Sequence, residues 1–222
     1  LVGSEMCIRD RSGRLGMKRL AGMCLSLILC VGMLAGCGTS VSSDDDLVYV
    51  DKKGKVTSID VEDLDASYYD EDELNSFVKD EIDQYTAENG KGTVLLKDLK
   101  VEDGKAKLTM EYKTPEDYAA FNGIELYQGK IVKALAAGYA FKADFVSVED
   151  GVEQKAATTK EIYATENLKV VIIKANTNVQ VDGDICYVSK ENVTLTGNNS
   201  VSIAEEGNHS FETDVYTYII YK

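Results

Sequence analysis

Two residues of this sequence have the spacing of a serine nucleophile and its neighbouring lysine. Ser76 and Lys79 form an S-x-x-K pattern, but the partner motifs S-D-N and K-T-G are absent, so we interpret the match as coincidence. His209 is the only histidine. A histidine-dependent triad or a histidine-rich zinc site would therefore have no second histidine to use. We predict no catalytic residue among these side chains.

Acidic side chains are crowded between positions 60 and 73, and carboxylates can bind calcium or act in pairs on glycosidic bonds. No ordered calcium-ligand pattern is found: with Gly183 placed as the EF-hand glycine, Ser189 stands where a bidentate glutamate belongs. We favour a solvated acidic face, and we predict no metal and no cofactor. A deep pocket holding two carboxylates with raised pKa values would instead favour a hydrolase. The crowded residues are Asp60, Glu62, Asp63, Asp65, Asp70, Glu71, Asp72 and Glu73.

The sequence contains 13 tyrosines and no tryptophan. Tyrosine suits a binding surface, because its ring offers contact area and its hydroxyl a hydrogen bond at a small entropic cost. The alternative is that these residues fill half-buried strand positions. Our candidates for a ligand surface are Tyr68, Tyr69, Tyr216, Tyr218 and Tyr221.

An uncharged apolar run, Leu20 to Leu34, follows Lys18 and Arg19 and ends in Ala35-Gly36-Cys37. A basic start, an apolar centre and small residues at the end are typical of a signal peptide. The run has 15 residues, fewer than the about 20 of a membrane-spanning helix, which makes that alternative the weaker one. Leu34-Ala35-Gly36-Cys37 resembles the lipobox of bacterial lipoproteins.

This resemblance implies cleavage between Gly36 and Cys37 and transfer of a diacylglyceryl group to the Cys37 sulfur. The protein would then be lipid-anchored at the outer face of the cell membrane, with the membrane as its partner through the lipid. The whole chain is similar in general character to uncharacterised, lysine-rich and arginine-poor lipoproteins of clostridia-like Gram-positive bacteria.

The domain organisation follows from the same features. Residues 1–11 resemble a translated sequencing adaptor, so we expect the native chain to begin at Met17; the alternative is a genuine N-terminal extension. We expect a non-native segment at 1–16, a signal peptide at 17–36, a lipidated flexible tether at 37–46 and a single extracellular domain at 47–222, with a candidate sub-boundary near 151–167.

Charge and cysteine content exclude several classes of function. Of 24 basic and 38 acidic residues, five and two lie before Cys37, which leaves a net charge of −17 on the mature chain. The mature chain from Cys37 onward has no arginine, and with its negative charge we exclude nucleic acid as a partner. Acylation of Cys37 would leave Cys186 alone, so no internal disulfide is expected. We expect Cys186 to be a small buried hydrophobic residue in a strand.

Two hairpin-then-helix units are expected to begin the domain. In the first, strands at 47–50 and 56–61 flank a turn at residues 52–54, and Asp70 and Glu73 form a capping box for a helix that ends before Gly90. The apolar face of this helix contains Leu74, Phe77, Val78, Ile82 and Tyr85.

The second unit repeats this arrangement. Strands at 94–101 and 105–112 flank Asp103-Gly104, and Thr114 caps a short helix that begins at Pro115. Residues 129–137 have helical spacing, and residues 141–145 alternate as a strand does.

The pattern is all β from Leu168 onward. Val170 to Ile173 is continuously apolar, which predicts a strand covered on both faces. Short strands are expected at 179–181, 185–188, 193–195, 201–203 and 215–221, as a meander, a small sandwich or solenoid rungs. We therefore predict an α+β fold, with an antiparallel sheet from hairpin-then-helix units followed by a C-terminal all-β meander.

These features favour a non-catalytic binding or accessory domain at the cell surface, with an envelope protein or glycan as partner. The alternative is a cell-envelope or glycan hydrolase that uses a carboxylate pair. A structural spacer is a third interpretation. A shallow, tyrosine-lined surface without a carboxylate pair of raised pKa would favour binding.

Overall fold

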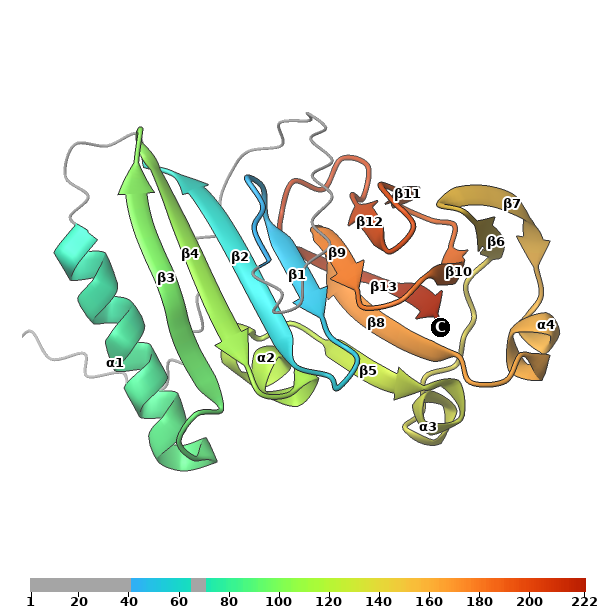
Figure 1. Cartoon of the computed structure of the whole chain (residues 1–222), viewed down its shortest axis with the longest axis horizontal. Coiled ribbons are helices and arrows are strands. Elements are labelled where there is room, and N and C mark those ends of the chain that lie inside the picture. Colours follow the sequence, from blue (N-terminus) through green and yellow to red (C-terminus); the bar gives the residue numbers. More distant parts are fainter. Residues whose placement is uncertain (1–40, 65–70) are drawn as a thin grey trace, which may run out of the picture.

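The computed structural model describes residues 41–64 and 71–222, which form two β-sheets and several helices in an α+β fold (Figure 1). The larger sheet contains β1 (Leu47–Val50), β2 (Val56–Asp63), β3 (Val94–Glu102), β4 (Lys105–Tyr112), β9 (Asn178–Val181), β11 (Val193–Leu195) and β12 (Ser200–Ile203). The smaller sheet contains β5 (Leu126–Lys130), β6 (Phe145–Glu149), β7 (Val152–Ala157), β8 (Lys169–Ala175), β10 (Ile185–Ser189) and β13 (Glu212–Tyr221). The helices are α1 (Glu71–Asn89), α2 (Pro115–Asn122), α3 (Ile131–Ala136) and α4 (Thr159–Ala164).

The strand order is β11-β12-β9-β1-β2-β4-β3 in the larger sheet and β5-β8-β13-β10-β6-β7 in the smaller one. Neighbouring strands are antiparallel except β1 and β9, which are parallel and align Leu47 with Asn178. The predicted C-terminal strands are present, and they are divided between the two sheets.

The two hairpin-then-helix units are confirmed. β1 and β2 are joined by a turn in which Gly54 has a φ of 90°, and β3 and β4 are joined at Asp103-Gly104. α1 ends at Asn89, just before Gly90 with its φ of 100°. Of the predicted capping box, Asp70 lies outside the described residues.

Local sequence chemistry explains the start of α2. The Thr114 hydroxyl accepts a hydrogen bond from the Asp117 backbone N–H at 3.1 Å, and Pro115 occupies the first turn.

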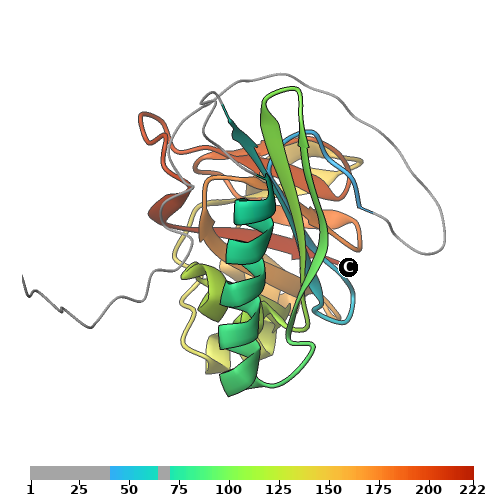
Figure 2. The ribbon, with the colours of Figure 1, turned by 90° about the vertical axis from the view of Figure 1, so that its left-hand side faces the viewer.

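Phe77, which was expected on the buried face of α1, is 47% exposed, whereas Val78 is buried. The helix therefore buries a narrower stripe than its sequence predicted, packing mainly against β3 (Figure 2).

Strand β8 is buried on both faces, as its apolar run predicted. Val171 and Ile173 belong to the core between the two sheets. Val170 and Ile172 belong to a second cluster on the outer face of the smaller sheet, which α3, α4 and the loop at 137–144 cover. The smaller sheet is thus a middle layer.

Two local predictions differ from the structure. Gly129 and Lys130 end strand β5, so the predicted helix at 129–137 is shorter and begins at Ile131. β6 begins only at Phe145, because Phe141 turns the chain with a φ of 45°. Residues 151–167, the candidate sub-boundary, form β7, which pairs with β6, and α4, whose Ile162 is buried in the outer cluster.

Candidate functional site

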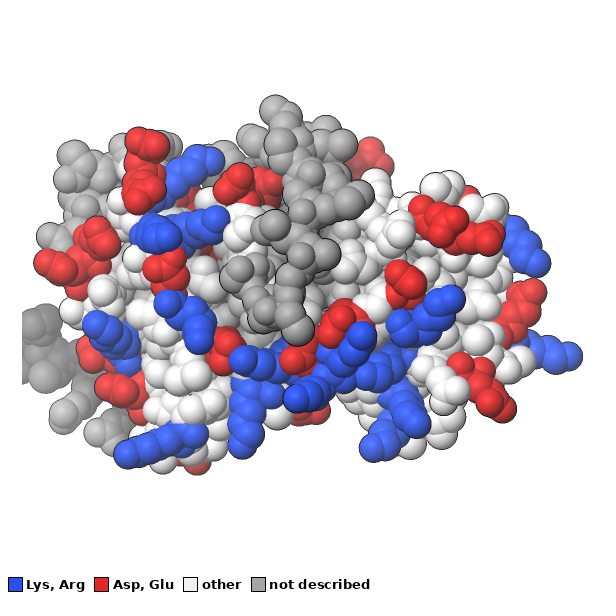
Figure 3. Space-filling model, viewed as in Figure 1, with Lys and Arg blue, Asp and Glu red and all other residues white. Residues whose placement is uncertain are grey.

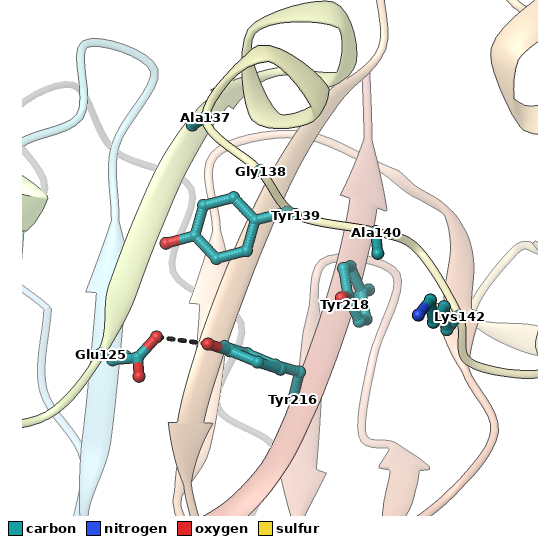
Figure 4. Close-up of a pocket in the computed structure, with 8 residues that line it drawn as sticks. All are labelled: Glu125, Ala137, Gly138, Tyr139, Ala140, Lys142, Tyr216 and Tyr218. Atoms are coloured by element: carbon teal, nitrogen blue, oxygen red, sulfur yellow. Dashed lines mark hydrogen bonds between the residues drawn. The ribbon is translucent and has the colours of Figure 1, made fainter.

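An open hollow of about 410 Å³ lies on the outer face of the smaller sheet (Figure 4). Its walls come from β13, from the segment before β5 and from the loop that follows α3. The lining residues are Glu125, Ala137, Gly138, Tyr139, Ala140, Lys142, Tyr216 and Tyr218.

Strand register places Tyr216 and Tyr218 of this hollow, and Tyr127 beside it, on one face of the smaller sheet. Tyr218 of β13 and Tyr127 of β5 both align with Ile172 of β8, so their side chains project from the same side of the sheet. Tyr216 lies two residues before Tyr218 and therefore shares that side. The fourth ring, Tyr139, is supplied by the loop after α3.

The loop that carries Tyr139 is fixed at both ends. Gly138 has a φ of 99° and closes α3 with a hydrogen bond from its N–H to the Leu135 carbonyl. Phe141 is buried against Tyr218, with their ring centroids 5.0 Å apart. Tyr139 is thereby held between two neighbours: its ring centroid lies 5.0 Å from that of Tyr127 and 5.9 Å from that of Tyr216.

Three polar side chains form a compact group beside these rings. The Tyr216 hydroxyl donates a hydrogen bond to Oε2 of Glu125 at 2.6 Å, and Lys174 Nζ lies 3.2 Å from Oε1 of the same carboxylate. Lys174 Nζ also lies 4.3 Å from the centroid of the Tyr216 ring. Side chains that hold one another in this way present a preorganised polar surface.

The same contacts fix the ionisation of the group. The hydrogen bond from Tyr216, aided by Lys174, lowers the pKa of Glu125, and the bond to Glu125 raises the pKa of Tyr216. Burial lowers the pKa of Lys174, but the hydrogen bond and charge of Glu125 outweigh it and leave the pKa above its usual value. At neutral pH the group is a carboxylate, an ammonium and a neutral phenol.

The predicted ligand residues have different positions in the structure. Tyr216 is half-buried and lines the hollow, and Tyr218 lines its floor although it is only 4% exposed. Tyr221 is 1% exposed, lies in the core between the sheets and accepts a hydrogen bond from Gln128 Nε2 at 2.9 Å. Its expected role in a ligand surface is therefore corrected to a core role. Gly36, Cys37, Tyr68 and Tyr69 lie outside the described residues.

Sequence reasoning did not select Glu125, Tyr127, Tyr139 or Lys174. Glu125 and Tyr127 lie two residues apart, but Tyr139 and Lys174 come from separate segments, and no local spacing relates them to that pair.

A second hollow of about 540 Å³ lies next to the first. It is lined by Glu116, Tyr127, Gln128, Gly129, Lys130, Lys133 and Lys169. A Cβ atom added to Gly129 would lie 2.6 Å from the Tyr127 hydroxyl oxygen and 3.0 Å from Cζ, so the glycine allows the Tyr127 ring to lie over the strand. Because this ring also contacts Tyr139, Tyr127 separates the two hollows.

Three carboxylates have raised pKa values: Asp60 and Glu62 on β2 of the larger sheet, and Asp46 just before β1. Burial, followed by the negative charge of Asp46, raises the pKa of Asp60 to about 7. Burial and the charges of Asp46, Asp60 and Asp63 raise the pKa of Glu62 to about 7, and burial also raises that of Asp46. None of these carboxylates lines either hollow.

Other chemistry is limited among residues 41–64 and 71–222. No group of three or more His, Cys, Asp or Glu side chains there is placed to hold a metal ion. Cys186 is half-buried, its Sγ lies 3.6 Å from the Asp184 carbonyl, and burial raises the pKa of its thiol. In the same part of the chain, no helix has both the length and the apolar character needed to cross a membrane.

No protein-family model, curated protein or solved structure matches this chain. The interpretation of the two hollows therefore depends on their own geometry and charge.

Proposed function

We propose that this protein is a lipid-anchored extracellular domain that binds an envelope glycan without catalysis. The sugar would occupy the tyrosine hollow on the outer face of the smaller sheet. The anchor would be the diacylglyceryl group on Cys37, which the sequence from Leu34 to Cys37 predicts. The observation that carries the binding proposal is the chain of ring contacts from Tyr127 through Tyr139 and Tyr216 to Tyr218, in which Tyr216 is also held by the Glu125 carboxylate and the Lys174 ammonium.

Sugars present both polar and apolar surface to a protein. The C–H face of a pyranose ring packs against an aromatic ring, and its hydroxyls need donors and acceptors around the edge. The hollow offers the rings of Tyr139 and Tyr216, with Glu125 as acceptor and Lys142 as donor on its lining. Lys174, which lies over the Tyr216 ring and beside Glu125, is a further donor next to it. An open hollow with fixed side chains also admits a long polymer at a small ordering cost.

The ionisation of the hollow supports binding over hydrolysis. A glycoside hydrolase needs a carboxylic acid that stays protonated near neutral pH beside a second carboxylate. Glu125 has a lowered pKa, and it is the one carboxylate among the residues lining the tyrosine hollow. Asp60 and Glu62 have raised pKa values but line neither hollow.

Replacement of Tyr139 tests the glycan proposal. Tyr139→Ala removes the central ring, and we expect a loss of affinity of about tenfold, corresponding to about 1.4 kcal/mol of stacking. The measurement is binding of the full chain, held in non-ionic detergent, to fragments of purified cell-envelope glycan, by calorimetry. Phe77→Ala is the matched control, since it removes an exposed aromatic ring from the distant helix α1.

Two outcomes would contradict the proposal. Equal affinities of Tyr139→Ala and the unaltered protein would show that the tyrosine hollow does not contact the glycan. Release of reducing ends from the glycan during the incubation would favour the hydrolase alternative.

A further inference from the structure

The second hollow, which we call the lysine hollow, concentrates positive charge on a strongly acidic protein. Lys130, Lys133 and Lys169 line it, with Glu116 as its one acidic lining residue. The full chain has a net charge of −14. Lysines gather along the lower edge of the molecule in Figure 3, the region where Figure 1 places β5 and α3.

These lysines are not neutralised within the described part of the chain. Lys130, Lys133 and Lys169 form no ion pair with a carboxylate there, whereas Lys52, Lys55 and Lys174 do. Lys169 Nζ instead donates a hydrogen bond to the Lys52 carbonyl at 2.6 Å, which holds it at the hollow. Ammonium groups that share a hollow repel one another, and an anion bound among them removes that repulsion.

The lysine hollow and the tyrosine hollow adjoin through a pair of rings. Tyr127 lines the lysine hollow, and its ring contacts that of Tyr139, which lines the tyrosine hollow. The missing side chain at Gly129 lets the Tyr127 hydroxyl reach over the strand on the lysine side. A single extended ligand can therefore contact both hollows across these rings.

We propose that the ligand is an anionic glycan, whose sugar rings occupy the tyrosine hollow and whose phosphate or carboxylate groups bind Lys130, Lys133 and Lys169. This inference rests on the proposed function and adds the charge of the ligand to it. Lysine binds such groups as a point charge rather than through a planar fork. Binding should therefore tolerate variation in the position of the anionic group and weaken as salt increases.

The concave shape favours a polymer over a membrane surface. The lysines surround a hollow of about 540 Å³ that also contains Tyr127 and Gln128. A flat lipid surface would meet the rim of such a hollow, whereas a substituent on a chain can enter it.

Charge-matched lysine variants test the inference in the full chain, held in non-ionic detergent. The probes are a neutral chito-oligosaccharide, its 6-phosphorylated form and its 6-carboxylate form, with inorganic phosphate and phosphatidylglycerol vesicles as further arms. We expect the unaltered protein to prefer the two anionic sugars, and Lys130→Gln/Lys133→Gln to lose about tenfold in affinity for them while it still binds the neutral sugar. Lys79→Gln/Lys91→Gln makes the same change in net charge at exposed positions outside both hollows and should bind as the unaltered protein does.

The outcomes separate the two proposals. Equal affinity of the unaltered protein for all three sugars, with Tyr139→Ala weakening each, overturns the anionic inference and leaves glycan binding intact. If inorganic phosphate or the vesicles bind as tightly as the phosphorylated sugar, and Tyr139→Ala weakens binding of none of the sugars, both proposals are overturned, because the sugar then contributes nothing. Loss of the anionic preference in the Lys130→Gln/Lys133→Gln variant alone supports the inference, and the ratio of the phosphate and carboxylate sugars identifies the substituent.

Discussion

Asp60 is a carboxylate placed where a neutral side chain would be expected. It lies on β2 opposite Leu108 of β4, and Ser58 Oγ donates a hydrogen bond to its Oδ2 at 2.9 Å. One hydrogen bond does not replace the water that burial removes, and the nearby charge of Asp46 adds repulsion. The carboxyl group is therefore more stable protonated in the folded protein than in the unfolded chain.

A pH dependence of stability follows from this shift. The pKa of Asp60 is about 7 in the folded protein, against 3.8 ordinarily, so between these values the folded state binds more protons than the unfolded one. The free energy of unfolding should therefore fall as pH rises through this window and stay low above it. Asp60→Asn removes this titration. Measured by urea unfolding, the free energy of unfolding of the variant relative to that of the unaltered protein should be about 2 kcal/mol higher at pH 8 than at pH 4.5.

Asp80→Asn makes the same charge change at an exposed position of α1. Its effect on the free energy of unfolding should be small and similar at both pH values. If Asp60→Asn changed stability equally at pH 4.5 and pH 8, Asp60 would not carry the predicted titration.

At the scale of elements, strand β8 contributes residues both to the core between the sheets and to the outer cluster that contains the tyrosines of the site. Its apolar run was readable in the sequence because residues buried on both faces leave no alternation. The hairpins and α1 were equally readable, since Gly54, Gly104 and Gly90 mark their turns and end. Strand β5 was not predicted, because the short segment from Leu126 to Lys130 contains a glycine and ends in lysine.

The candidate site was predictable only in part, for a related physical reason. Tyr216 and Tyr218 were selected, together with Tyr221, because they lie in the predicted final strand. Tyr139 and Lys174 join them only after β5, β8 and β13 have paired and α3 has closed over the sheet. Pairing between distant segments leaves no mark in local spacing, as the parallel pair of β1 and β9 also shows.

Because β8 is buried on both faces, we predict that adjacent residues of this strand contribute similarly to the free energy of unfolding. Ile172 faces the outer cluster and Ile173 faces the core between the sheets, and each is at most 1% exposed. We expect Ile172→Ala and Ile173→Ala each to lower the free energy of unfolding by about 2–5 kcal/mol, measured by urea unfolding. Glu153→Ala on the exposed strand β7 is the control and should change it by less than about 0.5 kcal/mol.

A strand covered on one face only would give a different result. One of the two isoleucine variants would then be nearly neutral, and the three-layer arrangement around β8 would be contradicted.

At the scale of the whole molecule, charge separates the proposed anchor from the proposed site. The mature chain would have a net charge of −17, which anionic lipid headgroups repel, so attachment to the membrane would depend on the lipid of Cys37. The lysine hollow is a positively charged region on this negatively charged protein, and in our proposal it binds the anionic groups of the ligand.

The anchor has a direct test in cells of a Gram-positive host. Cys37→Ser removes the sulfur that the lipid would occupy, and we expect the protein to move from the membrane fraction to the soluble fraction or the medium. Immunoblots of the fractions measure this change, and Cys186→Ser is the matched control, because it removes the cysteine on β10 and should leave the protein in the membrane fraction. Unchanged membrane retention of Cys37→Ser would refute acylation at this residue.

The position of β1 has a mechanical consequence. This strand lies inside the larger sheet, paired with β2 on one side and β9 on the other, and the chain enters it through Asp46. Asp46 is itself held, since its Oδ1 accepts a hydrogen bond from the Val61 N–H and its carbonyl accepts one from Asn178 Nδ2. A pull on the chain along β1 would load both ladders in shear, so their hydrogen bonds would have to break together rather than one at a time. A domain tethered at this point could bear drag on a bound polymer without peeling from an edge.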